Sequence, residues 1–305
     1  MFLASAVQAG SGNGDRCPGE RFAIETIAGG TSPYVMLDAG EKRGYFLLDY
    51  GTTRSSLSRD IFKSYGREDQ ASLQTPLSLP SFSSGRFDLA TYRLLEQPPG
   101  GQLGIIGTDF LSLLTADFSF RGGKSDVVLD ARPCDHDVLK ARGLIPVRQG
   151  GFFASDPRSL DPSMPNVPVL FVSAAGISAA AQMDTGYDDR GLPPSVDIND
   201  AFFAKLVAAG VSLHAIGKVT VTTCRGVATH DVFAAPQTQL SLETDERREI
   251  KILRGVALIR KSANGCGGIA DMSSPAAQLG MSVIAGLGTV VFDAPSGLVW
   301  VRPEK

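Results

Sequence analysis

The sequence predicts a mainly β protein made of two similar lobes, with few short helices. Its 34 glycines and 18 prolines favour many short strands joined by turns over long helices. Two blocks of residues also recur in the same order along the chain, which indicates a duplicated architecture. The chain of 305 residues can hold two lobes of about 140 residues each. Hydrophobic residues make up 43% of the chain, which supplies a sizeable core and excludes wholesale disorder.

The first repeated block predicts a strand, a turn and a second strand that ends at an aspartate. Its copies run from Pro33 to Asp49 and from Pro168 to Asp184, with equal spacing between the proline and the aspartate. A glycine stands two residues after each aspartate and provides the backbone freedom for a tight turn. Apolar residues alternate in both first strands, as half-buried strands require: Val35, Leu37 and Ala39 in one copy, and Leu170, Val172 and Ala174 in the other.

The second repeated block predicts an apolar strand, a glycine and a further strand. It covers residues 103–118 in the first copy and residues 278–292 in the second, and each copy continues into another strand. We therefore divide the chain into a tail at 1–16, an N-terminal lobe at 17–134, an interlobe linker at 135–162 and a C-terminal lobe at 163–305.

Three local features complete this outline. The linker contains a candidate strand at 144–148. A helix is predicted near 198–209, with Asp197 or Asn199 as its N-cap and Gly210 at its end. The charged run at 243–251 is most simply a solvated hairpin turn.

Charge and composition exclude several classes of function. The 29 basic and 32 acidic residues give a net charge of −3, which lacks the basic footprint of a protein that binds nucleic acid. No apolar run reaches the roughly 18 residues that a spanning helix needs, so no membrane span is expected. The three histidines and four cysteines show no zinc-binding spacing, and no metal site is expected.

The cysteines bear on the cellular compartment. The pairing that respects the repeat joins Cys17 to Cys134 and Cys224 to Cys266, one disulfide in each half; four buried free thiols in a cytoplasmic protein are the alternative. Residues 7–9 have the small-x-small pattern of a signal-peptidase site, although the preceding stretch is short and lacks a basic region. The tail is then either a signal-peptide remnant or a flexible segment. We favour an exported protein, periplasmic or secreted.

Asp49 and Asp184 are the candidate catalytic residues. They occupy equivalent turns of the two repeated blocks, so a pseudo-twofold axis between the lobes would bring their carboxyl groups face to face. Two carboxyl groups about 3 Å apart cannot both ionise readily, and they share a proton. Such a pair can act as general base and general acid together. The alternative interpretation is two ordinary turn aspartates.

At these positions the sequence resembles the pepsin-like and retropepsin-like aspartic proteases. Residues 184–186 are the Asp-Thr-Gly active-site tripeptide of that family, and residues 49–52 (Asp-Tyr-Gly-Thr) repeat the pattern with tyrosine in the middle. Ile106 and Gly107 resemble the apolar strand and glycine that close the family's ψ-shaped loop, and Gly280 is a weaker second copy. The resemblance implies a bilobal fold of two pseudo-twofold-related, β-barrel-like lobes.

The function that the resemblance implies is aspartic endopeptidase activity. Asp49 and Asp184 would activate a water molecule in the cleft between the lobes, without a metal or a cofactor. A monomer suffices, and the substrate would be a peptide or protein in extended conformation. The residues that would support the pair are Tyr50, Gly51, Thr52, Ile106, Gly107, Thr185, Gly186, Tyr187 and Gly280.

Two departures from the family pattern keep an alternative open. Tyr50 stands where the family has threonine or serine, and Tyr187 replaces a hydroxyl residue that supports the second carboxylate. The alternative is an inactive or weak relative that binds proteins, for example as an inhibitor. A Tyr50 ring that fills the water position would favour binding, and a ring that points away would favour catalysis.

The hairpin flap of the family has two candidate positions in the N-terminal lobe. One is the turn at 66–71 and the other is the hairpin at 83–85. Tyr65 and Phe82 are candidates to line the cleft, with core packing as the alternative.

Overall fold

The computed structural model describes most of the chain, with gaps. The described residues are 16–27, 30–39, 42–64, 66, 72–78, 87–93, 101–121, 124–151, 167–188, 192, 194–244, 246–266 and 268–302. The tail at 1–15, Tyr65, Phe82, most of the first candidate flap turn and all of the second lie outside these residues.

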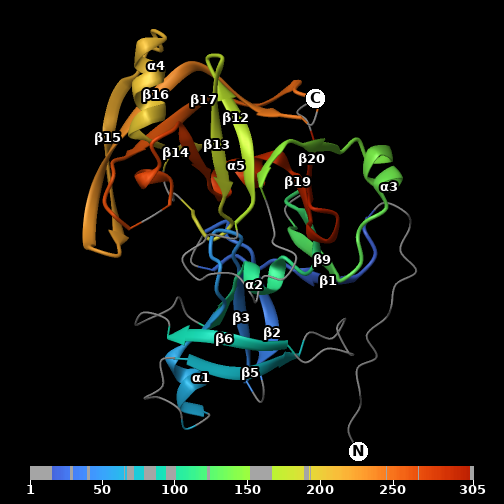
Figure 1. Cartoon of the computed structure of the whole chain (residues 1–305). Coiled ribbons are helices and arrows are strands. Elements are labelled where there is room, and N and C mark those ends of the chain that lie inside the picture. The colour runs from blue at the N-terminus through green and yellow to red at the C-terminus, as the bar shows by residue number, and fades with distance from the viewer. Residues whose placement is uncertain are drawn as a thin grey trace, which may run out of the picture.

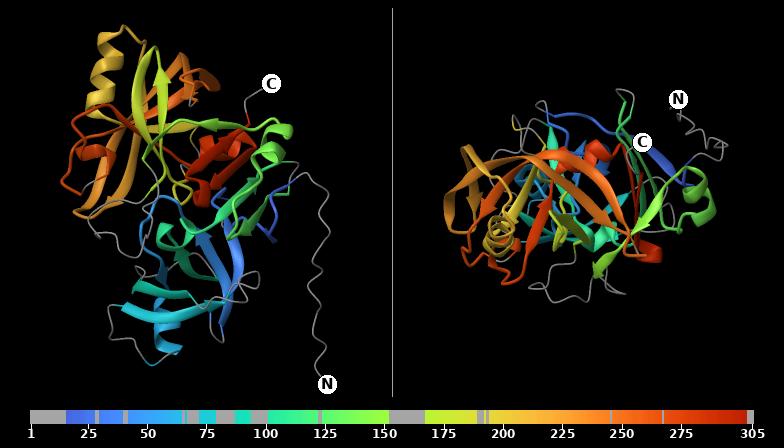
Figure 2. Two further views of the ribbon diagram at one scale, coloured as in Figure 1. Left: turned by 45° about the vertical axis from the view of Figure 1, so that its right-hand side comes forward. Right: turned by 90° about the horizontal axis from the view of Figure 1, so that it is seen from above.

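The described chain is mainly β with few short helices, as predicted. Its strands form a closed barrel, a six-stranded sheet and an eight-stranded sheet. Figures 1 and 2 show the barrel at one end of the molecule and the eight-stranded sheet at the other, with the six-stranded sheet beside their junction. The strands of all three sheets bury a common set of apolar side chains.

The closed barrel contains the N-terminal copy of the first repeated block and the first strand of the second. Its strand order is β2-β3-β7-β4-β6-β5. Its strands are β2 (Tyr34–Ala39), β3 (Lys42–Leu48), β4 (Ser56–Leu57), β5 (Ser72–Ser78), β6 (Phe87–Arg93) and β7 (Gln102–Ile106), and helices α1 (Arg59–Ser64) and α2 (Thr108–Leu111) belong to the same part of the chain.

The eight-stranded sheet contains the corresponding C-terminal strands, while the final strand of the second block belongs to the six-stranded sheet in both copies. Its order is β11-β12-β13-β18-β14-β17-β16-β15. The strands are β11 (Gln149–Gly151), β12 (Val169–Ala174), β13 (Ile177–Met183), β14 (Ser195–Asn199), β15 (His214–Thr223), β16 (Gly226–Glu243), β17 (Glu249–Lys261) and β18 (Ala276–Leu279), accompanied by α4 (Asp200–Ala208), η3 (Ile269–Asp271), α5 (Met281–Ile284) and η4 (Ala285–Leu287).

The six-stranded sheet mixes strands from both ends of the chain. Its order is β1-β9-β8-β19-β20-β10, and β8 and β19 join the N-terminal and C-terminal halves as an antiparallel pair. The strand predicted at 144–148 is β10, which pairs with β20. The bounds are β1 (Glu20–Ala23), β8 (Thr115–Ser119), β9 (Asp126–Asp130), β10 (Ile145–Val147), β19 (Thr289–Asp293) and β20 (Leu298–Val301), with α3 (His136–Ala141) and η5 (Ala294–Ser296) between strands.

The first repeated block folds the same way in both halves. Strands β2 and β3 form an antiparallel pair, as do β12 and β13. In each copy the opening proline accepts a hydrogen bond from the residue just before the aspartate: Leu48 N donates to Pro33 O at 3.0 Å, and Met183 N donates to Pro168 O at 2.9 Å.

The second repeated block also keeps its hydrogen bonds. Strand β3 runs parallel to β7, and β13 runs parallel to β18. The carbonyl of Gly107 accepts from the amides of Phe110 and Leu111 at the start of α2. The carbonyl of Gly280 accepts from Val283 and Ile284 at the start of α5 in the same manner.

Two local predictions have specific outcomes. The helix predicted near 198–209 is α4, and Asn199 is its N-cap, because its side-chain oxygen accepts from Phe202 N at 2.9 Å. Asp197, the other candidate cap, lies inside β14 and pairs with Lys261. The charged run at 243–251 does turn between β16 and β17, but Glu243 at its base is only 14% exposed and pairs with Arg148.

Asp117 anchors one end of the six-stranded sheet. Its carboxylate is fully buried and accepts hydrogen bonds from the guanidinium groups of Arg16 and Arg142 and from the amide of Cys17. The disulfide between Cys17 and Cys134 lies beside this cluster. A buried charge is stable only when it is paired in this way.

Both predicted cysteine pairs are present as disulfides, Cys17 with Cys134 and Cys224 with Cys266. The paired cysteines are 117 residues apart in sequence in the first disulfide and 42 residues apart in the second. Two disulfides are consistent with an exported protein. Among the described residues, no helix is both long and apolar enough to cross a membrane.

Replacing Cys17 and Cys134 together by alanine will lower the free energy of unfolding by about 2–5 kcal/mol, because the unfolded chain regains the freedom of a long loop. Urea unfolding without reductant measures this change. Adding reductant will destabilise the wild type but will destabilise the double variant less, since one disulfide is already absent. Equal unfolding free energies for wild type and variant would contradict the expectation.

Candidate active site

Asp49 and Asp184 each stand at the end of the second strand of a repeated block. Asp49 follows β3, and its amide donates to Ile106 O of β7 at 2.9 Å. Asp184 follows β13, and its amide donates to Leu279 O of β18 at the same distance, 2.9 Å. The two parallel strand pairs therefore deliver both aspartates to their turns in the same way.

The turns after the two aspartates hold the carboxyl groups from behind. Gly51 N donates to Oδ1 of Asp49 at 2.7 Å, and Gly186 N donates to Oδ1 of Asp184 at 2.9 Å. A Cβ atom on Gly51 would overlap the carboxyl group of Asp184, and one on Gly186 would overlap that of Asp49. Each turn therefore lies directly against the opposite carboxyl group, and only glycine leaves room for this approach.

The two carboxyl groups form one hydrogen-bonded pair in a poorly hydrated setting. Burial raises the pKa of Asp49 well above its ordinary value, the neighbouring Asp184 charge raises that pKa further, and the amides of Gly51 and Gly186 act in the opposite direction. Burial also raises the pKa of Asp184, while the amide of Gly186 and the hydrogen bond with Asp49 lower it. Neither residue is fully buried, so part of each residue's surface faces solvent.

Thr185 links the two turns to each other. Its hydroxyl is fully buried, donates to Leu48 O at 2.6 Å and accepts from Tyr50 N at 2.9 Å. One side chain from the C-terminal half thus bonds the backbone on both sides of Asp49. The reciprocal link would need a short hydroxyl side chain at position 50, where this chain has tyrosine.

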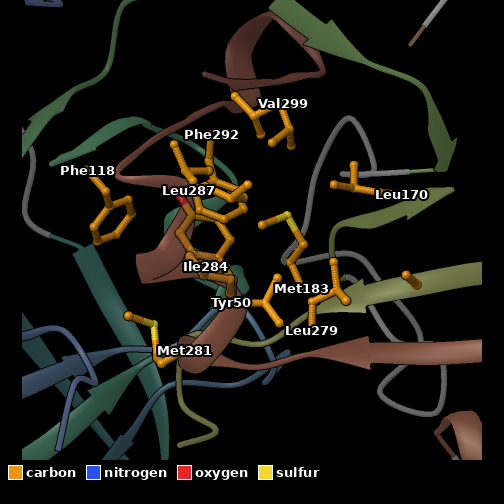
Figure 3. Packing of buried hydrophobic residues seen from close by; sticks show 14 of the residues in the cluster. Tyr50, Phe118, Leu170, Met183, Leu279, Met281, Ile284, Leu287, Phe292 and Val299 are labelled. Carbon is orange, nitrogen blue, oxygen red and sulfur yellow. The ribbon is translucent and has the colours of Figure 1, made fainter. Parts of the chain in front are cut away.

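Tyr50 packs into the core behind the pair. Its ring is fully buried and stacks on Phe292 of β19 with centroids 3.8 Å apart, and it meets Phe118 of β8 edge-on. Figure 3 shows the ring among apolar side chains that include Met183 and Ile284. Within the described structure the phenol oxygen has no hydrogen-bond partner, and burial raises the pKa of Tyr50. The side chain at position 50 is therefore held by aromatic stacking and not by a hydrogen bond to the other half.

The hydroxyl groups that the resemblance places beside the carboxylates have other partners. The hydroxyl of Thr52 donates to Arg54 O at 3.4 Å, and its carbonyl accepts from Thr108 N. The phenol of Tyr187 donates to Asp197 Oδ1 at 3.4 Å, and its carbonyl accepts from Met281 N. These carbonyl contacts place the turns after Asp49 and Asp184 against the starts of α2 and α5, next to Gly107 and Gly280.

Two polar contacts of the site were missed by sequence reasoning. Gln278 donates from Nε2 to Oδ2 of Asp184 at 2.8 Å. In the other half, the Ser55 hydroxyl donates to Asp109 and accepts from Gly107 N, which fixes the strand end below Asp49. Gln278 could have been found, because a glutamine replaces the apolar residue that the first copy has at the same distance before its glycine, Ile105.

The described residues contain no group of histidine, cysteine, aspartate and glutamate side chains arranged to hold a metal ion. No protein-family model matches the chain, and no curated protein matches it either. The function is therefore inferred from the geometry of the carboxyl pair.

Replacing Thr185 by valine will lower the free energy of unfolding by about 2 kcal/mol, because Leu48 O and Tyr50 N both lose a buried partner. Urea unfolding measures the loss. Thr220→Val is the matched control: Thr220 lies exposed on β15, where the same change should cost less than about 0.5 kcal/mol. A Thr185→Val loss no larger than the control's would show that the bridge contributes nothing to stability.

Replacing Asp49 by asparagine will stabilise the fold at neutral pH. The folded pKa of Asp49 lies above its ordinary value of 3.8, so the wild type loses stability as the pH rises from below 3.8 through the raised pKa. The variant has no carboxyl group there and escapes this loss. Unfolding free energies measured between pH 3 and 7 test the expectation, with the exposed Asp137→Asn as control. A variant less stable than the wild type at pH 7 would contradict it.

Proposed function

We propose that this protein is an aspartic endopeptidase of the pepsin-like or retropepsin-like kind. The observation that carries the proposal is that Asp49 and Asp184 form a hydrogen-bonded pair. The two residues lie on equivalent turns, and neither is fully buried. The bilobal arrangement with a pseudo-twofold axis belongs to the same proposal. Its support is the matching set of hydrogen bonds around the two turns.

The proposed reaction uses one proton shared by the pair. The ionised carboxylate takes a proton from water, whose oxygen attacks the carbonyl carbon of the peptide bond, while the protonated carboxyl group gives its proton to the carbonyl oxygen. This gives a tetrahedral diol. The diol then returns a hydroxyl proton to one carboxylate as the other carboxyl group protonates the leaving nitrogen. The C–N bond breaks, a carboxylic acid and an amine leave, and the pair again holds one proton.

The position of Tyr50 supports catalysis over binding alone. Its ring is stacked on Phe292 inside the core and does not occupy the space in front of the carboxyl groups. The large side chain that follows Asp49 in sequence therefore does not cover the carboxyl groups of Asp49 and Asp184. A peptide or protein substrate in extended conformation, bound by a monomeric, exported enzyme, completes the proposal.

An inactive, protein-binding relative is the second candidate. The observation in its favour is that both expected supporting hydroxyls are directed elsewhere, Thr52 to Arg54 and Tyr187 to Asp197. The carboxyl pair is then retained while its support has changed. Activity measurements separate this candidate from the first.

The purified protein will cleave an unfolded protein substrate at acidic pH, and Asp49→Asn and Asp184→Asn will each lower the rate at least a hundredfold, because either change removes a proton-transfer group. Peptide release measured from pH 3 to 7 tests this. The rate will fall as the pH rises past the higher pKa of the pair, since the shared proton is then lost.

Asp137→Asn is the control for this experiment, because the Asp137 side chain is 92% exposed and belongs to α3. It should leave the rate unchanged. Absence of cleavage by the folded wild type at every pH would favour the protein-binding candidate. Cleavage that survives both active-site substitutions would rule out the carboxyl pair as the catalyst.

A further inference from the structure

Gln278 breaks the equivalence of the two halves at the carboxyl pair. Each carboxyl group accepts one hydrogen bond from the glycine of its own turn, at 2.7 Å for Asp49 and 2.9 Å for Asp184. Within the described part of the chain, only Asp184 receives an additional side-chain amide, from Gln278 Nε2 at 2.8 Å. The position equivalent to Gln278 in β7 is Ile105, which carries no polar group.

The chemistry of the contact gives it a direction. An ionised carboxylate only accepts hydrogen bonds, and the side-chain nitrogen of glutamine only donates them. A donated bond stabilises the charged form of the acceptor. Gln278 therefore favours ionisation of Asp184, and among the described residues no side-chain amide makes the same contact with Asp49.

We propose that Gln278 is a positioning residue that keeps Asp184 as the ionised member of the pair and leaves the shared proton on Asp49. Resting on the proposed function, this assigns the two roles: Asp184 takes the proton from water, and Asp49 protonates the carbonyl oxygen of the substrate.

The other charged groups around Gln278 are already neutralised or bonded. Asp197 of β14 lies opposite Gln278 in the sheet and pairs with Lys261 of β17 at 3.1 Å, both largely buried. The phenol of Tyr187 bonds the same carboxylate. Asp188, beside the second turn, accepts from Thr31 N at 2.6 Å. Among the described side chains, the amide of Gln278 is the neutral donor that bonds Asp184 and not Asp49. The backbone amide of Tyr187 acts in the same direction, since it also lowers the pKa of Asp184.

The test replaces Gln278 by methionine, which has nearly the same shape and no amide. The carboxyl carbons of ¹³C-labelled aspartate are titrated by NMR, with Asp49→Asn and Asp184→Asn used to assign the pair. The lower pKa of the pair is expected to rise by about one unit, since a hydrogen bond to the charged form is lost. In the cleavage assay, the acidic limb of the pH–rate profile should move upward by a similar amount.

Gln239→Met is the matched control. Gln239 is half-buried in the same sheet, and its amide donates to two backbone carbonyls, Leu240 O and Leu253 O. It should alter stability without moving the titration of the pair. If the lower pKa of the pair shifts equally in this control, the effect of Gln278→Met comes from a general loosening of the sheet, and the proposal is overturned.

Two further results of the titration would overturn the proposal about Gln278. A folded Gln278→Met protein with an unchanged lower pKa overturns the proposal, and so does a fall in that pKa, which would mean that the Gln278 carbonyl accepts a hydrogen bond from a neutral Asp184. If the methionine variant does not fold, Gln278→Leu provides the same test, because leucine also lacks the amide and adds no charge; an upward shift is expected and any other result contradicts the proposal. The titration needs no turnover, so failure of the protease proposal remains distinguishable from failure of this one.

Discussion

The contact between the carboxyl groups of Asp49 and Asp184 sets the requirements that the surrounding structure meets. Two like acids close together and away from bulk water resist joint ionisation, so the backbone must force them together. Each turn does so by placing a glycine against the opposite carboxyl group, where any side chain would overlap it. The parallel strand pairs β3–β7 and β13–β18 fix the positions of the two turns, and Thr185 bonds one turn to the other.

The two sides of the pair are held by different forces. Behind Asp49, the ring of Tyr50 is clamped on Phe292, so the first turn is secured by apolar packing against the six-stranded sheet. Around Asp184 the side-chain support is polar, from Gln278 and the Asp197–Lys261 ion pair nearby, while the hydroxyl of Thr185 bonds the backbone on both sides of Asp49. A duplicated framework has thus become chemically uneven where the halves meet. Unequal surroundings are the usual means by which two identical acids acquire different tasks.

Much of this could be predicted from local sequence, and the remainder depended on contacts across the fold. The repeated blocks indicated the strand–turn–strand units and both aspartates, and Asn199 and Gly210 marked the ends of α4. The pairing of the cysteines followed from the repeat. The location of the Tyr50 ring could not be predicted, because it depends on a phenylalanine far away in sequence. The amide of Gln278 and the redirected hydroxyl of Thr52 likewise depend on which strands become neighbours.

The stack of Tyr50 on Phe292 also determines when the site can exist. The sheet that carries Phe292 begins near Glu20 in β1 and ends at Val301 in β20, so it draws on nearly the whole chain. Contacts between such distant segments form late in folding, because their ordering cost must be met before they stabilise anything. A chain still emerging from the ribosome therefore has both aspartates but no assembled pair. The pair and the packing behind it are complete only after synthesis has passed residue 292.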